Sequence, residues 1–230
     1  MKKIFVLFTF LAVALVGFAQ QAVETKRTDH PFAFPEFRDA KILQPFGRYT
    51  TAKANIFLKD SRLVFMDGDK IKTAFVNNVY GVEFGDSISY LRIDSIMGRV
   101  IARRGYDSLL RVTTIDMQKY SAQSSGGNNL PFFEMEDLNV FLEIDGDQRE
   151  EAQGYPLKNT YYFMIKGVPY KATEKNIKKL IKPEMKKAFK NLMYDHYFSW
   201  NDEESLKKSL LFCLNKHRLH NPTDSSRNPE

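Results

Sequence analysis

The sequence predicts an α+β protein, in which an antiparallel β-meander, barrel-like or sandwich-like, is closed by two or three C-terminal helices. Three observations lead to this fold class. Apolar and polar residues alternate in the first half, turn-forming residues recur about every eight to twelve residues, and the last third carries apolar residues at helical spacing. The chain has 230 residues, of which 43% are hydrophobic and 13% aromatic, so it can bury a sizeable core.

The strands are predicted between residues 49 and 172. Ala52, Ala54 and Ile56 alternate with polar neighbours, which is the period of two typical of a half-buried strand. Further short strands are predicted at residues 63–66, 71–76, 79–84, 88–93, 96–102, 109–115, 139–144, 159–166 and 168–172. Because no helical stretch separates the strands as far as residue 116, they must pair mainly antiparallel, since parallel neighbours need long crossovers.

The chain from Thr173 onward is predicted to be helical, with Thr173 as the N-cap. Apolar residues recur there at helical spacing, at Ile177, Leu180, Ile181, Met185, Ala188, Phe189 and Leu192. Pro183 either kinks this helix or begins a second one at its first turn. A last helix follows Trp200, where Asn201 and Glu204 resemble a capping box.

The start of the chain has the pattern of a secretory signal peptide. Lys2 and Lys3 precede an apolar run over residues 4–16, and Gly17 and Ala19 place small residues before a cleavage site. The alternative is an uncleaved membrane anchor, but a bilayer span needs about 20 apolar residues, more than this run provides. We therefore predict an exported protein, periplasmic or secreted, whose mature chain has no transmembrane segment.

The composition suggests four parts along the chain. They are a signal peptide (1–19), a mobile leader (20–33), a single α+β domain (34–215, mainly β over 34–172 and helical over 173–215) and a flexible tail (216–230).

No catalytic residue, cofactor-binding motif or metal site is predicted. The formal net charge of +6 is small for a dedicated nucleic-acid binder, and a single cysteine cannot form an internal disulfide. The acidic residues at 143–147 suggest a calcium loop, but they lack the glycine and the glutamate that a helix-loop-helix calcium site requires. A solvated acidic loop is the favoured interpretation of this segment.

Lysines fill the polar side of the predicted helical region and are the one candidate binding surface. They are Lys175, Lys178, Lys179, Lys182, Lys186, Lys187 and Lys190. The simplest interpretation is a solvated helix face. The same lysines could instead offset the acidic residues at 134–151, or bind an anionic component of the cell envelope.

Several segments of the mature chain are distinctive: FPEFRDAKILQPFGRYTTAKANIFLKDSRLVF, GVEFGDSISY, GRVIARRGYDSLLRVTTIDMQKY, GYPLKNTYYFMIKG and FSWNDEESLKKSLLF. In these segments the chain resembles a family of uncharacterised exported proteins of Gram-negative anaerobic bacteria. That family has no assigned activity, so the resemblance implies export and one continuous domain, and it supplies no site residue.

The sequence therefore predicts a non-enzymatic exported envelope protein that acts by binding or scaffolding, with an envelope protein or an anionic envelope component as its partner. One alternative is a β-barrel-type carrier of a small apolar ligand, and a less favoured one is a hydrolase of unknown substrate. A carrier should contain an apolar cavity, a hydrolase should bring acids or a nucleophile and base together, and a scaffold should expose an apolar or aromatic patch.

Overall fold

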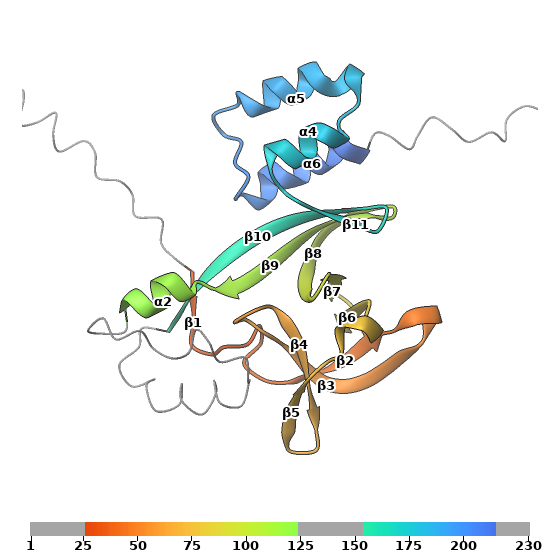
Figure 1. The fold of residues 1–230 in the computed structure, drawn as a ribbon, viewed down its shortest axis with the longest axis vertical. Coiled ribbons are helices and arrows are strands. Elements are labelled where there is room, and N and C mark those ends of the chain that lie inside the picture. The colour runs from red at the N-terminus through yellow and green to blue at the C-terminus, as the bar shows by residue number, and fades with distance from the viewer. Residues whose placement is uncertain (1–25, 124–153, 215–230) are drawn as a thin grey trace, which may run out of the picture.

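The computed structural model describes residues 26–123 and 154–214, and it confirms the α+β architecture (Figure 1). One antiparallel sheet curls into a half-barrel, and helices from the C-terminal part of the chain lie over one end of it. The strands are β1 (Arg27–Thr28), β2 (Arg38–Leu43), β3 (Tyr49–Phe57), β4 (Arg62–Asp67), β5 (Lys70–Thr73), β6 (Gly81–Phe84), β7 (Ile88–Ile93), β8 (Ile96–Arg104), β9 (Asp107–Ile115), β10 (Tyr155–Ile165) and β11 (Val168–Lys171). The α-helices are α2 (Met117–Gln123), α4 (Glu174–Leu180), α5 (Lys186–Met193) and α6 (Glu203–Leu214).

The strand order is β1-β10-β9-β8-β7-β6-β2-β3-β4-β5, with β11 paired to β10. All pairings are antiparallel, as the short connections predict. The two meanders, β2 to β5 and β6 to β9, are joined through the pairing of β2 with β6. That pairing links segments about forty residues apart in sequence, such as Ile42 and Val82.

The curl of the sheet brings distant strands into contact. The backbone N–H of Met97 donates to the carbonyl oxygen of Ser61 over 2.8 Å, and the Ser61 hydroxyl donates to the Met97 carbonyl over 2.7 Å. The N–H of Ile115 at the end of β9 donates to the carbonyl of Leu58, just after β3, over 2.8 Å. In the strand order, four other strands separate β9 from β3, so these bonds hold the sheet in its curved form.

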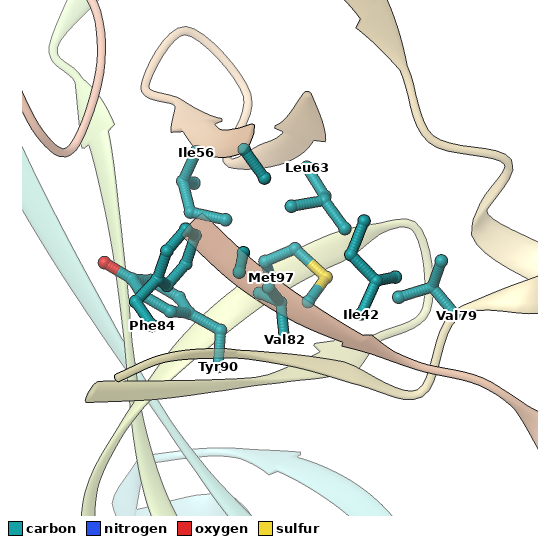
Figure 2. Packing of buried hydrophobic residues seen from close by; sticks show 10 residues of the cluster. Ile42, Ile56, Leu63, Val79, Val82, Phe84, Tyr90 and Met97 are labelled. Atoms are coloured by element: carbon teal, nitrogen blue, oxygen red, sulfur yellow. The ribbon is translucent and has the colours of Figure 1, made fainter. Parts of the chain in front are cut away.

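An apolar cluster fills the concave face of the sheet between β2, β3, β4, β6, β7 and β8 (Figure 2). Its buried members are Ala40, Ile42, Ala54, Ile56, Leu63, Val79, Val82, Phe84, Tyr90 and Met97. The alternation predicted for β3 is confirmed, because Ala54 and Ile56 both enter this cluster. Phe57, the next residue, is also buried, on the opposite face of β3, where it packs with Leu58 and Val64.

The helices cover a second apolar cluster on β9 and β10. Phe163 and Leu109, which are paired in register, are fully buried beneath Ile177 of α4 and Leu206 of α6. Burial of the apolar helix face against the sheet is what the helical spacing predicts. Because short helices are marginal alone, this contact stabilises them.

Pro183 begins a new helical turn rather than kinking one long helix. Residues Pro183–Met185 form a 3₁₀ turn that leads directly into α5. Lys182, the residue before the proline, is extended, since the proline ring disfavours helical dihedral angles there. Thr173 is confirmed as the N-cap of α4, where its hydroxyl accepts a hydrogen bond from the N–H of Asn176 over 3.4 Å.

Residues 26–33 belong to the fold, which differs from the predicted mobile leader over 20–33. Strand β1 pairs with β10, and the N–H of Leu58 donates to the Pro31 carbonyl over 2.8 Å. Phe32 packs between Phe37 and Phe57, with ring centroids 5.4 and 5.8 Å away. Aromatic burial at Phe32 and backbone pairing thus outweigh the polar composition of the segment.

Other predicted features lie outside the described residues. They are the signal peptide (1–19), residues 20–25 of the leader, the strand at 139–144, the acidic residues at 134–151 and the tail (216–230). Within the described ranges, no helix is long and apolar enough to span a bilayer.

The N-cap of α6 is Asp202, and the predicted capping box from Asn201 is wrong by one residue. The Asp202 carboxylate accepts a hydrogen bond from the N–H of Ser205 over 2.8 Å. That bond and a second one from the Ser205 hydroxyl lower the pKa of Asp202 below its ordinary value.

We expect Asp202→Ala to lower the free energy of unfolding by about 1 kcal/mol, because it removes the cap acceptor. Asn201→Ala is the control and should have little effect. Since the folded pKa of Asp202 is lowered, its ionised form stabilises the fold above the ordinary value of 3.8, and that contribution is lost as the pH falls through the folded pKa. Chemical denaturation of wild type and Asp202→Asn should therefore differ at pH 7 and converge at low pH. A constant difference would contradict this assignment.

Candidate functional site

The structure places the seven candidate lysines on two short helices and the link between them. Lys175, Lys178 and Lys179 lie on α4, Lys182 lies in the link, and the other three lie on α5. All are exposed except Lys182, which is half-buried and forms an ion pair of 3.6 Å with Glu184. The break at Pro183 therefore divides the lysines between two helices.

A pocket of about 470 Å³ lies between α4 and α5, and we call it the α4–α5 pocket. It is lined by Glu174, Lys178, Ile181, Lys186, Phe189, Lys190, Met193 and Tyr194. Ile181 and Phe189 are buried and belong to the core cluster under the helices, so the inner part of the pocket is apolar. The lysines are exposed and form its rim.

The rim of the pocket is positively charged. It carries three lysines against one carboxylate, Glu174. Within the described part of the chain, none of Lys178, Lys186 and Lys190 has a carboxylate within 4.0 Å. The ammonium group of Lys190 lies 5.8 Å from the centre of the Tyr194 ring, at the outer limit of a cation–π contact. These lysines can therefore pair with an external anion without breaking an existing ion pair.

The other candidate lysines are not brought into this pocket. Lys175 and Lys179 line a shallow open depression beside Thr173 at the start of α4. Lys187 lines neither hollow, and Lys182 is held by Glu184. Lys178 lines both hollows, so the structure places three of the lysines around an apolar floor and leaves the other four outside it.

Met193 and Tyr194 are site residues that sequence reasoning missed. Tyr194 is 72% exposed, and Met193 is half-buried. The sequence could have indicated Tyr194 as a neighbour of the lysines, because it follows Lys190 by four residues and such pairs lie on one helix face. Ile181 and Phe189 were predicted only as core residues. Helical spacing shows that a residue is buried, but it does not show whether the residue also lines a pocket.

Exposed aromatic residues gather at the turn between β2 and β3. Phe46 is 94% exposed with a positive φ of 60°, and Tyr49 and Tyr80 are both more than half exposed. Tyr49 pairs with Leu43 of β2, and the Leu43 carbonyl accepts the N–H of Tyr80 over 2.8 Å, so the two tyrosines flank the end of β2 on its two sides. Three exposed aromatic side chains thus lie near the end of this strand, where a scaffold could contact a partner.

The geometry around His30 bears on the hydrolase alternative. His30 Nδ1 lies 3.3 Å from the Thr28 hydroxyl and 2.7 Å from the Phe32 carbonyl oxygen. A carbonyl oxygen can only accept, so Nδ1 carries the proton and cannot act as a base toward Thr28. Among the described residues, no three His, Cys, Asp or Glu side chains are grouped so as to hold a metal ion.

Comparison of the chain with protein-family models, with curated proteins and with solved structures gave no match. The resemblance to exported proteins of Gram-negative anaerobic bacteria therefore stays a prediction.

Proposed function

We propose that this chain is an exported, non-enzymatic binding protein of the envelope, and that the α4–α5 pocket binds an anionic amphiphile. The observation that supports it is the apolar floor of Ile181 and Phe189 beneath three lysines that have no carboxylate of the described residues within 4.0 Å. The start of a hydrocarbon chain would contact the floor, and the anionic group would lie at the rim. The export pattern at residues 1–19 would deliver the protein to a compartment bounded by such lipids.

The dimensions and charges of the pocket fit this ligand class. A volume of about 470 Å³ lies within the range of roughly 300–1,000 Å³ that is usual for small-molecule pockets. A lysine near an anionic surface contributes about 1 kcal/mol of attraction, and this is screened over about 8 Å at physiological salt. Three lysines therefore give an affinity that is moderate and strongly dependent on ionic strength.

A carrier of a small apolar ligand is the second candidate, because the same floor could hold an uncharged chain. The two functions differ in what the lysines do. Loss of the lysine charges should abolish binding of an anionic amphiphile and leave binding of a neutral one unchanged.

We also propose that the curled sheet closes in a barrel-like rather than a sandwich-like arrangement. The bonds from Met97 to Ser61 and from Ile115 to Leu58 support this, because they join strands that lie far apart in the order of a single curved sheet. In a sandwich, two separate sheets would pack only through side chains.

The test is a triple change, Lys178→Gln, Lys186→Gln and Lys190→Gln, in the mature protein. At low salt we expect the wild type to bind phosphatidylglycerol vesicles, and the variant to bind them about 10- to 100-fold more weakly, because three favourable charges are lost. Its thermal stability should be unchanged, since these lysines are exposed and make no ion pair with described residues. Vesicle co-sedimentation and thermal denaturation measure the two quantities.

The control removes the same charge elsewhere, with Lys70→Gln, Lys158→Gln and Lys171→Gln, which are also exposed. Equal loss in both variants would mean general attraction of a basic protein and not a site. Tyr194→Ala tests the apolar contact and should weaken binding to vesicles more than it weakens binding to inorganic phosphate. Failure of the wild-type protein to bind anionic vesicles at low salt would contradict the proposal.

A further inference from the structure

A second hollow, of about 290 Å³, lies on the concave face of the sheet, and we call it the arginine cleft. Strands β7 to β10 provide one part of its lining, and the end of β3 together with residues 26–33 provides the other. It shares no lining residue with the α4–α5 pocket. The N-terminal segment therefore helps to build the cleft, which could not be expected from a mobile leader.

Two tyrosines and two arginines form a row across the strands that line the cleft. Tyr90 of β7 pairs with Arg99 of β8, Arg99 pairs with Arg111 of β9, and Arg111 pairs with Tyr161 of β10. Residues directly opposite on antiparallel strands have Cβ atoms about 4.5–5.5 Å apart and point to the same face. Two arginines are thus held side by side in a half-buried position, where like charges destabilise the sheet.

Cationic side chains predominate in the lining of the cleft. Among the described residues the lining contains four of them, Lys26, Arg27, Arg99 and Arg111, and no carboxylate. Outside the lining, Glu203 of α6 contacts Arg111, with 2.9 Å between Nη1 and Oε2. No carboxylate of the described residues lies within ion-pair distance of Arg99. Among the described residues, Glu203 therefore offsets the charge of Arg111 but not that of Arg99.

Hydrogen-bonding capacity is also left unused. Arg111 Nε is buried and has no hydrogen-bond partner in the described structure, which is costly for a charged donor. Burial raises the pKa of Tyr90, so its hydroxyl stays protonated and can donate. Thr113 and Asn159 add a hydroxyl and an amide on the neighbouring strands, bonded to each other over 2.8 Å.

We propose that the arginine cleft binds a small organic phosphate, with Arg99 as the main contact to the phosphate group. A dianionic phosphate offsets the excess charge that Glu203 leaves, and guanidinium groups bind phosphate oxygens in a two-point geometry. The volume is at the small end for ligand pockets, which favours a compound about as large as a sugar phosphate. Thr113 and Asn159 offer partners for ligand hydroxyl groups.

The test measures binding of glucose 6-phosphate to wild type and Arg99→Gln by isothermal titration calorimetry. We expect Arg99→Gln to bind about 10- to 100-fold more weakly, because a charge-assisted contact is lost. Its melting temperature without ligand should be equal to or higher than that of the wild type, because the repulsion between opposed arginines is relieved. If Arg99 were needed only for the fold, Arg99→Gln would instead lower the melting temperature of the protein without ligand. The control is Arg104→Gln, also on β8 but exposed, which should leave both quantities unchanged.

Four outcomes would overturn the proposal. They are no wild-type binding at millimolar glucose 6-phosphate, equal binding by Arg99→Gln, a large fall in the melting temperature of that variant, and equal affinity for inorganic phosphate, which would rule out an organic ligand. Glucose and inorganic phosphate are therefore tested beside the probe. Vesicle binding should be the same for wild type and Arg99→Gln, which separates this proposal from that for the α4–α5 pocket.

Discussion

Replacing Asn55 by alanine is expected to lower the free energy of unfolding by about 3–5 kcal/mol, because several buried hydrogen bonds are lost together. Asn55 lies on β3 and is completely buried. Its Oδ1 accepts from the N–H of Phe34 over 3.1 Å, and its Nδ2 donates to the carbonyl oxygens of Phe34 and Glu36 over 2.9 and 3.1 Å. One side chain thus holds the segment before β2 against the middle of the sheet.

Urea denaturation of Asn55→Ala and of Asn77→Ala, an exposed asparagine, would measure this effect. The control should change stability by no more than about 0.5 kcal/mol. Asn55→Asp keeps the acceptor for Phe34 but turns a carboxylate oxygen toward two carbonyls, so it should cost at least as much as alanine. A loss below about 1 kcal/mol in Asn55→Ala would show that water replaces the amide at little cost.

Phe163→Ala is expected to cost about 3–5 kcal/mol, because it leaves a cavity where β10 meets the helices. Phe163 is fully buried among Leu109, Ile177 and Leu206, and Trp200 packs against the same cluster. Loss of the ring should therefore loosen the helices and the sheet together. Tryptophan fluorescence and far-ultraviolet circular dichroism should report one transition, shifted to lower denaturant concentration.

Phe75→Ala is the matched control for this change, because Phe75 is 86% exposed. It should leave the transition within about 0.5 kcal/mol of the wild type. Two separate transitions in Phe163→Ala, with fluorescence lost first, would mean that the helices unfold independently of the sheet. The prediction of one α+β domain would then be wrong.

Local patterns predicted most of the elements. The alternation around Ala54, the turn residues between strands and the helical spacing around Ile177 depend only on near neighbours in sequence, and all three correspond to observed elements. The run at Ile56 and Phe57 was harder to interpret, because both faces of β3 are covered at that end. Period-two reasoning assumes one solvated face, which does not hold there.

Long-range pairing could not be predicted from these patterns. The pairing of β2 with β6 and the docking of Phe32 on Phe57 join segments that are far apart in sequence. The composition of one segment does not indicate which distant segment it contacts. The helical lysines were identified from spacing, but the pocket between them depends on where Pro183 divides the helices. The opposition of Arg99 and Arg111 depends on register, which shifts at a bulge between Val100 and Ala102 on β8. One residue of slip would turn either arginine to the other face.

The described sheet ends in short strands, and this affects the behaviour of the protein in concentrated solution. Open edges can recruit strands from other molecules and start aggregation. At one end β5 has four residues and carries Lys70 and Lys72, and near the other β11 carries Pro169, which has no N–H to donate. Short length, positive charge and proline each oppose edge-to-edge addition. The curved sheet can thus remain partly open while its ends give other chains little to pair with.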